Sequence, residues 1–108
     1  MIAAIEQSAR RVAELVRHAY VLLEAGADPA GDDPWIGISL ATLVVQATAL
    51  GGASGGVRPE VPEFGTVKDC LLAVLSELAA WDWDVLDGDD LRAGCQLVLD
   101  VADLVGAL

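Results

Sequence analysis

Aromatic residues are scarce in this sequence, where one Phe, one Tyr and three Trp make up 5% of the chain. A β-sandwich rich in aromatic side chains is therefore disfavoured. Alanine, leucine and valine instead supply 47 of the 108 residues, and Ala and Leu are good helix formers. The composition predicts an all-α protein, and this length is enough for one domain, 1–108, that folds without a metal or a disulfide.

Basic residues are also few. Six Lys and Arg face 17 Asp and Glu, which gives a formal net charge of −11 and a pI near 4.1. Such a charge repels the phosphate backbone of nucleic acids and anionic lipid headgroups. We therefore expect neither nucleic acid nor a membrane surface as a partner.

Cysteine and histidine are too sparse for a zinc site. Cys70 and Cys95 are 25 residues apart, without a Cys-x-x-Cys pair, and His18 is the only imidazole. A secretory signal would begin with a basic segment, and no basic residue precedes Glu6 in this sequence. These features predict free thiols, no cofactor and a cytoplasmic protein.

Hydrophobic periodicity and capping signals define the expected elements. Helices are predicted over about 2–25, 34–50, 66–83 and 89–107, with a long loop over 51–65. Asp33 before Pro34 is a strong helix start, and Thr66 followed by Asp69 resembles a capping box. We predict an antiparallel four-helix bundle; the alternative is a pair of helical hairpins that completes a bundle by dimerisation.

The segment 34–50 has no charged residue, so the sequence predicts that this helix is the least accessible of the four. Its apolar run is shorter than a membrane span, and Ser39, Thr42 and Gln46 form a polar stripe along it. These features favour a mostly buried helix of a bundle over a transmembrane helix.

The last helix carries two apolar seams. The first consists of Leu91, Cys95, Val98, Ala102 and Val105, and the second of Leu97, Val101, Leu104 and Leu108. One seam fills the bundle, and the other must be buried elsewhere. We expect the second seam to form the interface of a homo-oligomer, most simply a homodimer.

Five carboxylates cluster before the last helix, at Asp82, Asp84, Asp87, Asp89 and Asp90. They are weak candidates for a divalent metal site. A calcium loop of the EF-hand type that began at Asp82 would require an acid at position 5, Gly at position 6 and Glu at position 12, where this sequence has Leu86, Asp87 and Ala93. These acids are better explained as caps and favourable charges at the N-terminus of the last helix than as metal ligands.

Helices that alternate in direction would bring two acidic connections to one end of the bundle. That end would gather Asp28, Asp32 and Trp35 with Trp83 and the second acidic cluster. Mutual repulsion of so many carboxylates suggests a cationic partner, either a basic protein surface or a divalent ion. If the long loop returns the chain to the other end, this single acidic pole does not form.

No catalytic set emerges from the sequence. Glu14 and His18 are spaced at i,i+4, but no Ser or Cys nucleophile can be assigned beside them. This favours a non-catalytic interaction module, an adaptor or regulatory subunit, and leaves enzymatic activity open. The alternative function is binding of an apolar small molecule in a pocket between the helices.

Overall fold

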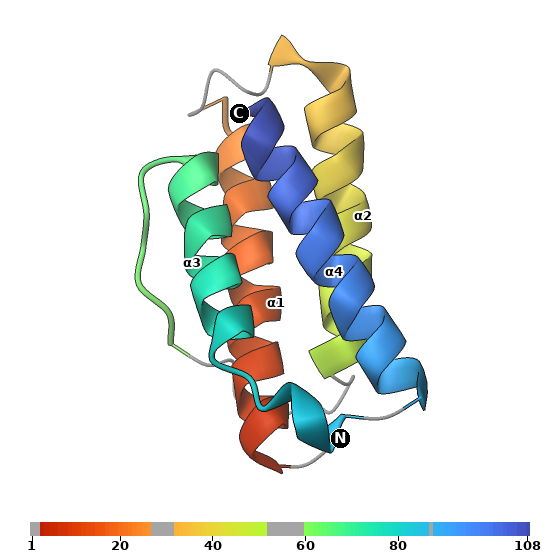
Figure 1. Ribbon diagram of the computed structural model, residues 1–108. Helices are drawn as coiled ribbons and strands as arrows, with labels where there is room; N and C mark the ends of the chain where they lie inside the picture. The colour runs from red at the N-terminus through yellow and green to blue at the C-terminus, as the bar shows by residue number, and fades with distance from the viewer. Residues whose placement is uncertain (1–2, 27–31, 52–59, 87) are drawn as a thin grey trace.

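The computed structural model in Figure 1 describes residues 3–26, 32–51, 60–86 and 88–108. Its elements are α1 (Ala3–Glu24), α2 (Pro34–Gly51), α3 (Val67–Ala79), the short 3-10 helix η2 (Trp83–Val85) and α4 (Gly88–Ala107). The described residues contain no β-strand, which confirms the all-α helical bundle. None of the described helices is long and apolar enough to cross a membrane.

The helix ends follow the capping signals in the sequence. Gly26 has a φ of 68°, the left-handed conformation that glycine adopts at low cost after a helix such as α1. The Asp33 carboxylate accepts a hydrogen bond from the backbone N–H of Trp35 at the start of α2, at 3.0 Å. Thr66 caps α3 because its hydroxyl oxygen accepts from the N–H of Asp69 at 3.1 Å.

Helix α3 ends at Ala79, earlier than the sequence predicts. The chain then turns, and Asp82 accepts a hydrogen bond from the N–H of Asp84, which starts η2. Trp81 lies beyond the helix with 6% of its surface exposed, and its indole N–H donates to the hydroxyl of Ser8 at 2.7 Å. Burial of this indole against α1 competes with continuation of the helix.

The four helices do not alternate in direction along the chain. Figure 1 shows α1 and α4 running one way and α2 and α3 the other, with the segment 60–66 returning along the outside of the bundle to the start of α3. Val61 and Phe64 in this segment pack against the core. Each helix is therefore antiparallel to the two that it packs against, and the alternating order expected from the sequence is wrong.

Helix α1 is the most embedded element, packed against both α2 and α3, while α4 completes the bundle against the same two helices. The core side chains include Val12, Val16, Leu40, Leu43, Leu71, Val74, Leu97 and Val101. Helix α2 shows a wide exposed face despite its lack of charge, with Ile38 68% and Val45 69% exposed. The expectation that this helix is the least accessible is wrong, because only one side of it meets other helices.

A polar network joins α1 to the C-terminal part of α3. Ser8, which accepts from Trp81, donates to the carboxylate of Glu77 at 2.7 Å, and Arg11 Nε donates to the same carboxylate at 2.7 Å. The hydrogen bond from Arg11 lowers the pKa of Glu77 below its ordinary value, opposed by burial and aided by Ser8. A carboxylate whose pKa falls on folding stabilises the protein above the pKa of its unfolded state.

We therefore expect Glu77→Gln to lower the free energy of unfolding at pH 7 by about 1 kcal/mol, because both partners are partly solvated. This difference in free energy of unfolding should shrink as the pH falls below the ordinary glutamate pKa of about 4.3 and then through the lower pKa that Glu77 has in the folded chain. Urea unfolding of both proteins at several pH values measures it. The matched control is Glu60→Gln, at an exposed position, and a deficit for Glu77→Gln that does not change with pH would contradict the assignment.

Candidate functional site

An apolar groove runs between α3 and α4. It has a volume of about 600 Å³ and is lined by Leu75, Leu78, Ala79, Trp83, Cys95, Val98 and Leu99. None of these side chains is charged, although the chain as a whole has a net charge of −11. The groove is thus open to solvent and lined only by uncharged side chains.

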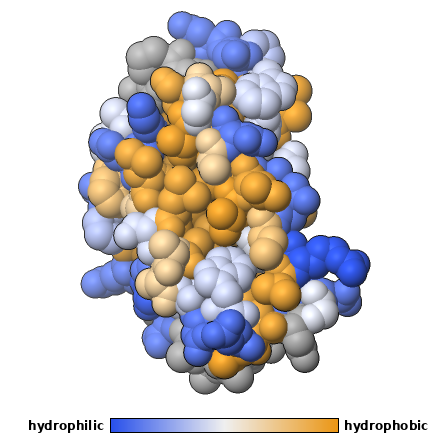
Figure 2. Space-filling model, in the orientation of Figure 1, coloured by the Kyte–Doolittle hydropathy of each residue, from blue (hydrophilic) through white to orange (hydrophobic). Residues whose placement is uncertain are grey.

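The apolar surface extends beyond the groove. Of the lining residues, Leu99 on α4 is 60% exposed, and Leu72, which lies outside the lining and about one turn before Leu75 on α3, is 45% exposed. Figure 2, drawn in the orientation of Figure 1, shows a continuous hydrophobic area across the middle of the molecule on this side. We call the surface formed by Leu72 and the groove residues the α3–α4 face. A contiguous exposed apolar area of this kind is typical of binding surfaces.

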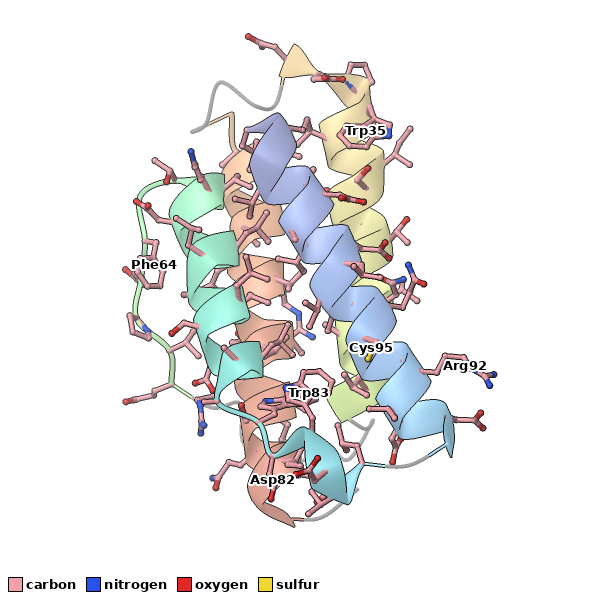
Figure 3. All side chains as sticks on the ribbon, viewed as in Figure 1. Trp35, Phe64, Asp82, Trp83, Arg92 and Cys95 are labelled. Carbon is pink, nitrogen blue, oxygen red and sulfur yellow. The ribbon has the colours of Figure 1, made fainter. Side chains whose placement is uncertain are left out.

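Trp83 closes the lower end of the groove, where Figure 3 shows it between α3 and α4. Its indole N–H donates to the backbone carbonyl of Leu78 at 3.1 Å, and its ring lies 5.5 Å from that of Trp81. The ring also presses against Gly94 of α4, where an added Cβ would lie 2.8 Å from Cζ3 of Trp83. A glycine at this position lets α4 approach the indole.

We expect Gly94→Ala to lower the free energy of unfolding by about 1–3 kcal/mol, because the new methyl group overlaps a ring held on its other side. Gly106→Ala is the control, since nothing lies within 4 Å of the Cβ it would add. That change should stabilise α4 by up to about 1 kcal/mol through helix propensity. Urea unfolding of the two variants separates these effects, and equal gains in both would rule out the close contact.

The predicted interface lies inside the chain's own bundle. Leu97 and Val101 are fully buried and Leu104 is 1% exposed, all within the single core, while Leu108 is half-buried against it. The first seam, which the sequence analysis assigned to the core, is more exposed and contributes Cys95 and Val98 to the groove. The assignment of the second seam to an interface is therefore wrong, because α4 turns this seam toward α2 and α3.

The two acidic connections lie at opposite ends of the bundle. Figure 3 places Trp35 at one end and Trp83 with Asp82 at the other, and Asp32 adjoins the start of α2. Asp28 and Asp87 lie outside the described residues. The prediction of a single acidic pole is therefore wrong. The segment 60–66 returns the chain to the other end of the bundle before α3 begins, so the connection after α3 lies opposite the one before α2.

The described acids around the start of α4 are mostly exposed. Asp82, Asp84 and Asp89 are exposed and Asp90 is half-buried. Asp82 uses its carboxylate to accept from the N–H of Asp84. Within the described ranges, no group of three or more His, Cys, Asp or Glu side chains could hold a metal ion.

The single histidine belongs to a surface cluster on α1. Glu14 is 3.0 Å from Arg17 and 3.5 Å from Nε2 of His18. These residues line a pocket of about 440 Å³ with Phe64 of the crossing segment. Neither cysteine forms a disulfide: Cys70 is buried, and Cys95 is exposed in the groove.

The sequence matches no protein-family model, and comparisons with curated proteins and with solved structures find no match. The site must therefore be interpreted from its own chemistry. Sequence reasoning missed Leu72, Leu75 and Leu99 as surface residues. The sequence did contain one indication of this surface: Leu99 is apolar although it belongs to neither seam of the last helix.

Proposed function

We propose that this protein is a non-catalytic interaction module that self-associates through its α3–α4 face. The observation that carries the proposal is the uncharged groove, whose lining residue Leu99 is exposed, together with the exposed Leu72 about one turn before Leu75 on α3. Burying apolar surface is worth about 25 cal/mol per Å², so a partner that covers this face gains stability by excluding water. We also propose a cytoplasmic location, which is supported by two cysteines that are not joined in a disulfide.

A second copy of the chain suits this face better than a charged partner would. The groove residues of two copies can pack together without burying a charged side chain of the lining, although each chain has a net charge of −11. A two-fold axis across the helices would also keep the Asp82 ends of the two copies apart, which limits their repulsion. The interface is then isologous, with α4 of one copy against α3 and α4 of the other.

The protein is expected to sediment as a dimer, and Leu99→Glu to sediment as a monomer with unchanged helical circular dichroism. Leu99 is 60% exposed, so the new carboxylate is solvated in the free chain but desolvated in the dimer. The matched control is Val45→Glu on α2, which adds the same charge at a side chain 69% exposed. This control should remain dimeric.

A monomeric parent protein at concentrations up to the millimolar range would overturn the self-association. Equal dissociation by Leu99→Glu and Val45→Glu would overturn the choice of face, because it would indicate general charge repulsion. Association only with a basic protein, weakening as salt rises, would instead identify the acidic end beside Trp83 as the binding surface.

The second candidate function is binding of an apolar small molecule in the same groove. Its volume of about 600 Å³ lies within the range typical of ligand pockets. We expect the neutral dye Nile red to bind once per chain with a low-micromolar dissociation constant in a fluorescence titration. Ala79→Glu, which charges an exposed position in the lining, should abolish that binding. Dye uptake that does not saturate, or that Ala79→Glu leaves unchanged, would contradict a pocket.

A further inference from the structure

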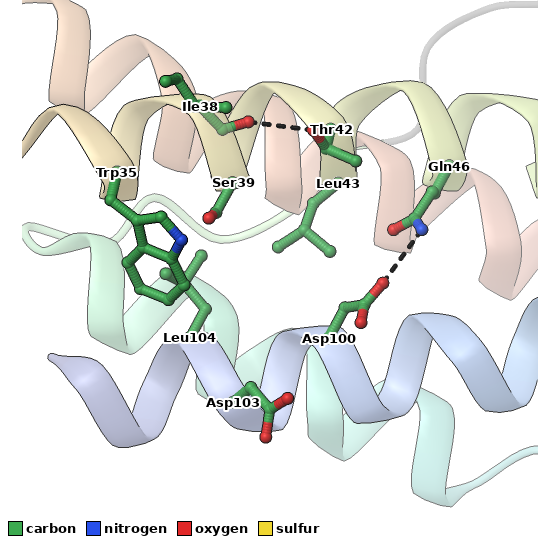
Figure 4. Close-up of a pocket in the computed structure, with 9 residues that line it drawn as sticks. All are labelled: Trp35, Ile38, Ser39, Thr42, Leu43, Gln46, Asp100, Asp103 and Leu104. Carbon is green, nitrogen blue, oxygen red and sulfur yellow. Dashed lines mark hydrogen bonds between the residues drawn. The ribbon is translucent and has the colours of Figure 1, made fainter.

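A second, smaller pocket lies between α2 and α4 and differs in chemistry from the groove. It has a volume of about 200 Å³ and is lined by Trp35, Ile38, Ser39, Thr42, Leu43, Gln46, Asp100, Asp103 and Leu104. Figure 4 shows the Trp35 indole at one end and the Gln46 and Asp100 pair at the other, with Leu43 and Leu104 between them. The polar stripe of α2 therefore faces α4 here.

Among the residues that the structure describes, the carboxylates of this pocket have no cationic partner. Asp100 accepts hydrogen bonds from Gln46 Nε2 at 3.0 Å and from Gln96 Nε2 at 2.9 Å, both from neutral amides. Asp103, one turn further along α4, is exposed. None of the ion pairs among the described residues includes either aspartate. Asp100 and Asp103 thus place two carboxylates at the pocket, and no described cationic side chain pairs with either of them.

Gln46 adds to this negative potential. Its amide is oriented by Asp100, because a flipped amide would place an oxygen against the carboxylate. The oxygen Oε1 is then buried with no hydrogen-bond donor, and Figure 4 shows it on the side of Leu43, within the pocket wall. Thr42 does not compensate, because its hydroxyl donates to the carbonyl of Ile38 at 3.0 Å. The pocket thus offers the acceptor oxygens of Asp100, Asp103 and Gln46, beside the donor groups of Ser39 and of the Trp35 indole.

We propose that this pocket binds a small organic cation, a primary ammonium group on a compact apolar body. Asp100 and Asp103 supply charge-assisted acceptors for the N–H donors of the ligand. Leu43 and Leu104 supply an apolar floor, and the indole of Trp35, which is 52% exposed, covers the ligand and favours a cation electrostatically. An anionic or a neutral ligand of the same shape finds no counter-charge here. This proposal does not depend on self-association, because α2 lies away from the α3–α4 face.

The test is a two-dimensional NMR titration of the labelled protein with phenethylammonium chloride, and with 2-phenylethanol as the neutral analogue. We expect saturable shifts of the Trp35 indole and of the amides of Gln46, Asp100 and Asp103, with a dissociation constant of about 1 mM for so small a ligand. The Trp83 indole is the internal reference and should not move. The alcohol should bind at least about tenfold more weakly.

Two variants locate the effect. Asp103→Asn should weaken phenethylammonium about fivefold to tenfold, while Asp89→Asn, which removes the same charge at the far end of α4, should not. Equal affinity for the alcohol and the ammonium would overturn the proposal. It would also be overturned by equal weakening in both variants, or by shifts that do not saturate below about 50 mM.

Discussion

The direction of α3 depends on the segment 60–66, which returns the chain along the outside of the bundle before α3 begins. Val61 and Phe64 hold this segment against the core, so the crossing is part of the packed structure. Helices α2 and α3 therefore run in the same direction, and α1 packs antiparallel against both of them. The last helix must lie across α2 and α3 and away from α1.

This arrangement explains the two surfaces of interest. Helix α4 has neighbours on one side only, so its Leu97 and Val101 seam fills the core while Cys95 and Leu99 remain in water. The same placement sets its Asp100 edge against α2, where Gln46 meets it at 3.0 Å. One edge of α4 thus contributes Cys95 and Leu99 to the apolar groove, and the other contributes Asp100 and Asp103 to the pocket beside α2. The acidic connections are separated for the same reason, since the crossing sends them to opposite ends.

Sequence reasoning captured the local structure well because local signals carry it. Asp33 with Pro34, and Thr66 with Asp69, begin helices where expected, and the apolar periodicity located all four helices. The end of α3 was missed because burial of Trp81 against Ser8 is a tertiary contact. The choice between the two seams of α4 was also wrong, because periodicity gives the angular separation of two seams but not their orientation in the bundle. The path of the long connection, on which the acidic pole depended, has no local signal at all.

Cys95 offers the most direct measurement of whether the α3–α4 face is covered in solution. It is exposed within that face, while Cys70 is fully buried and serves as the unreactive reference in the folded chain. The rate constant for alkylation of Cys95 by excess iodoacetamide should be measured over a wide range of protein concentration. Self-association through this face predicts a rate constant that falls toward zero as the dimer forms. A rate constant that is the same at every protein concentration would contradict the account.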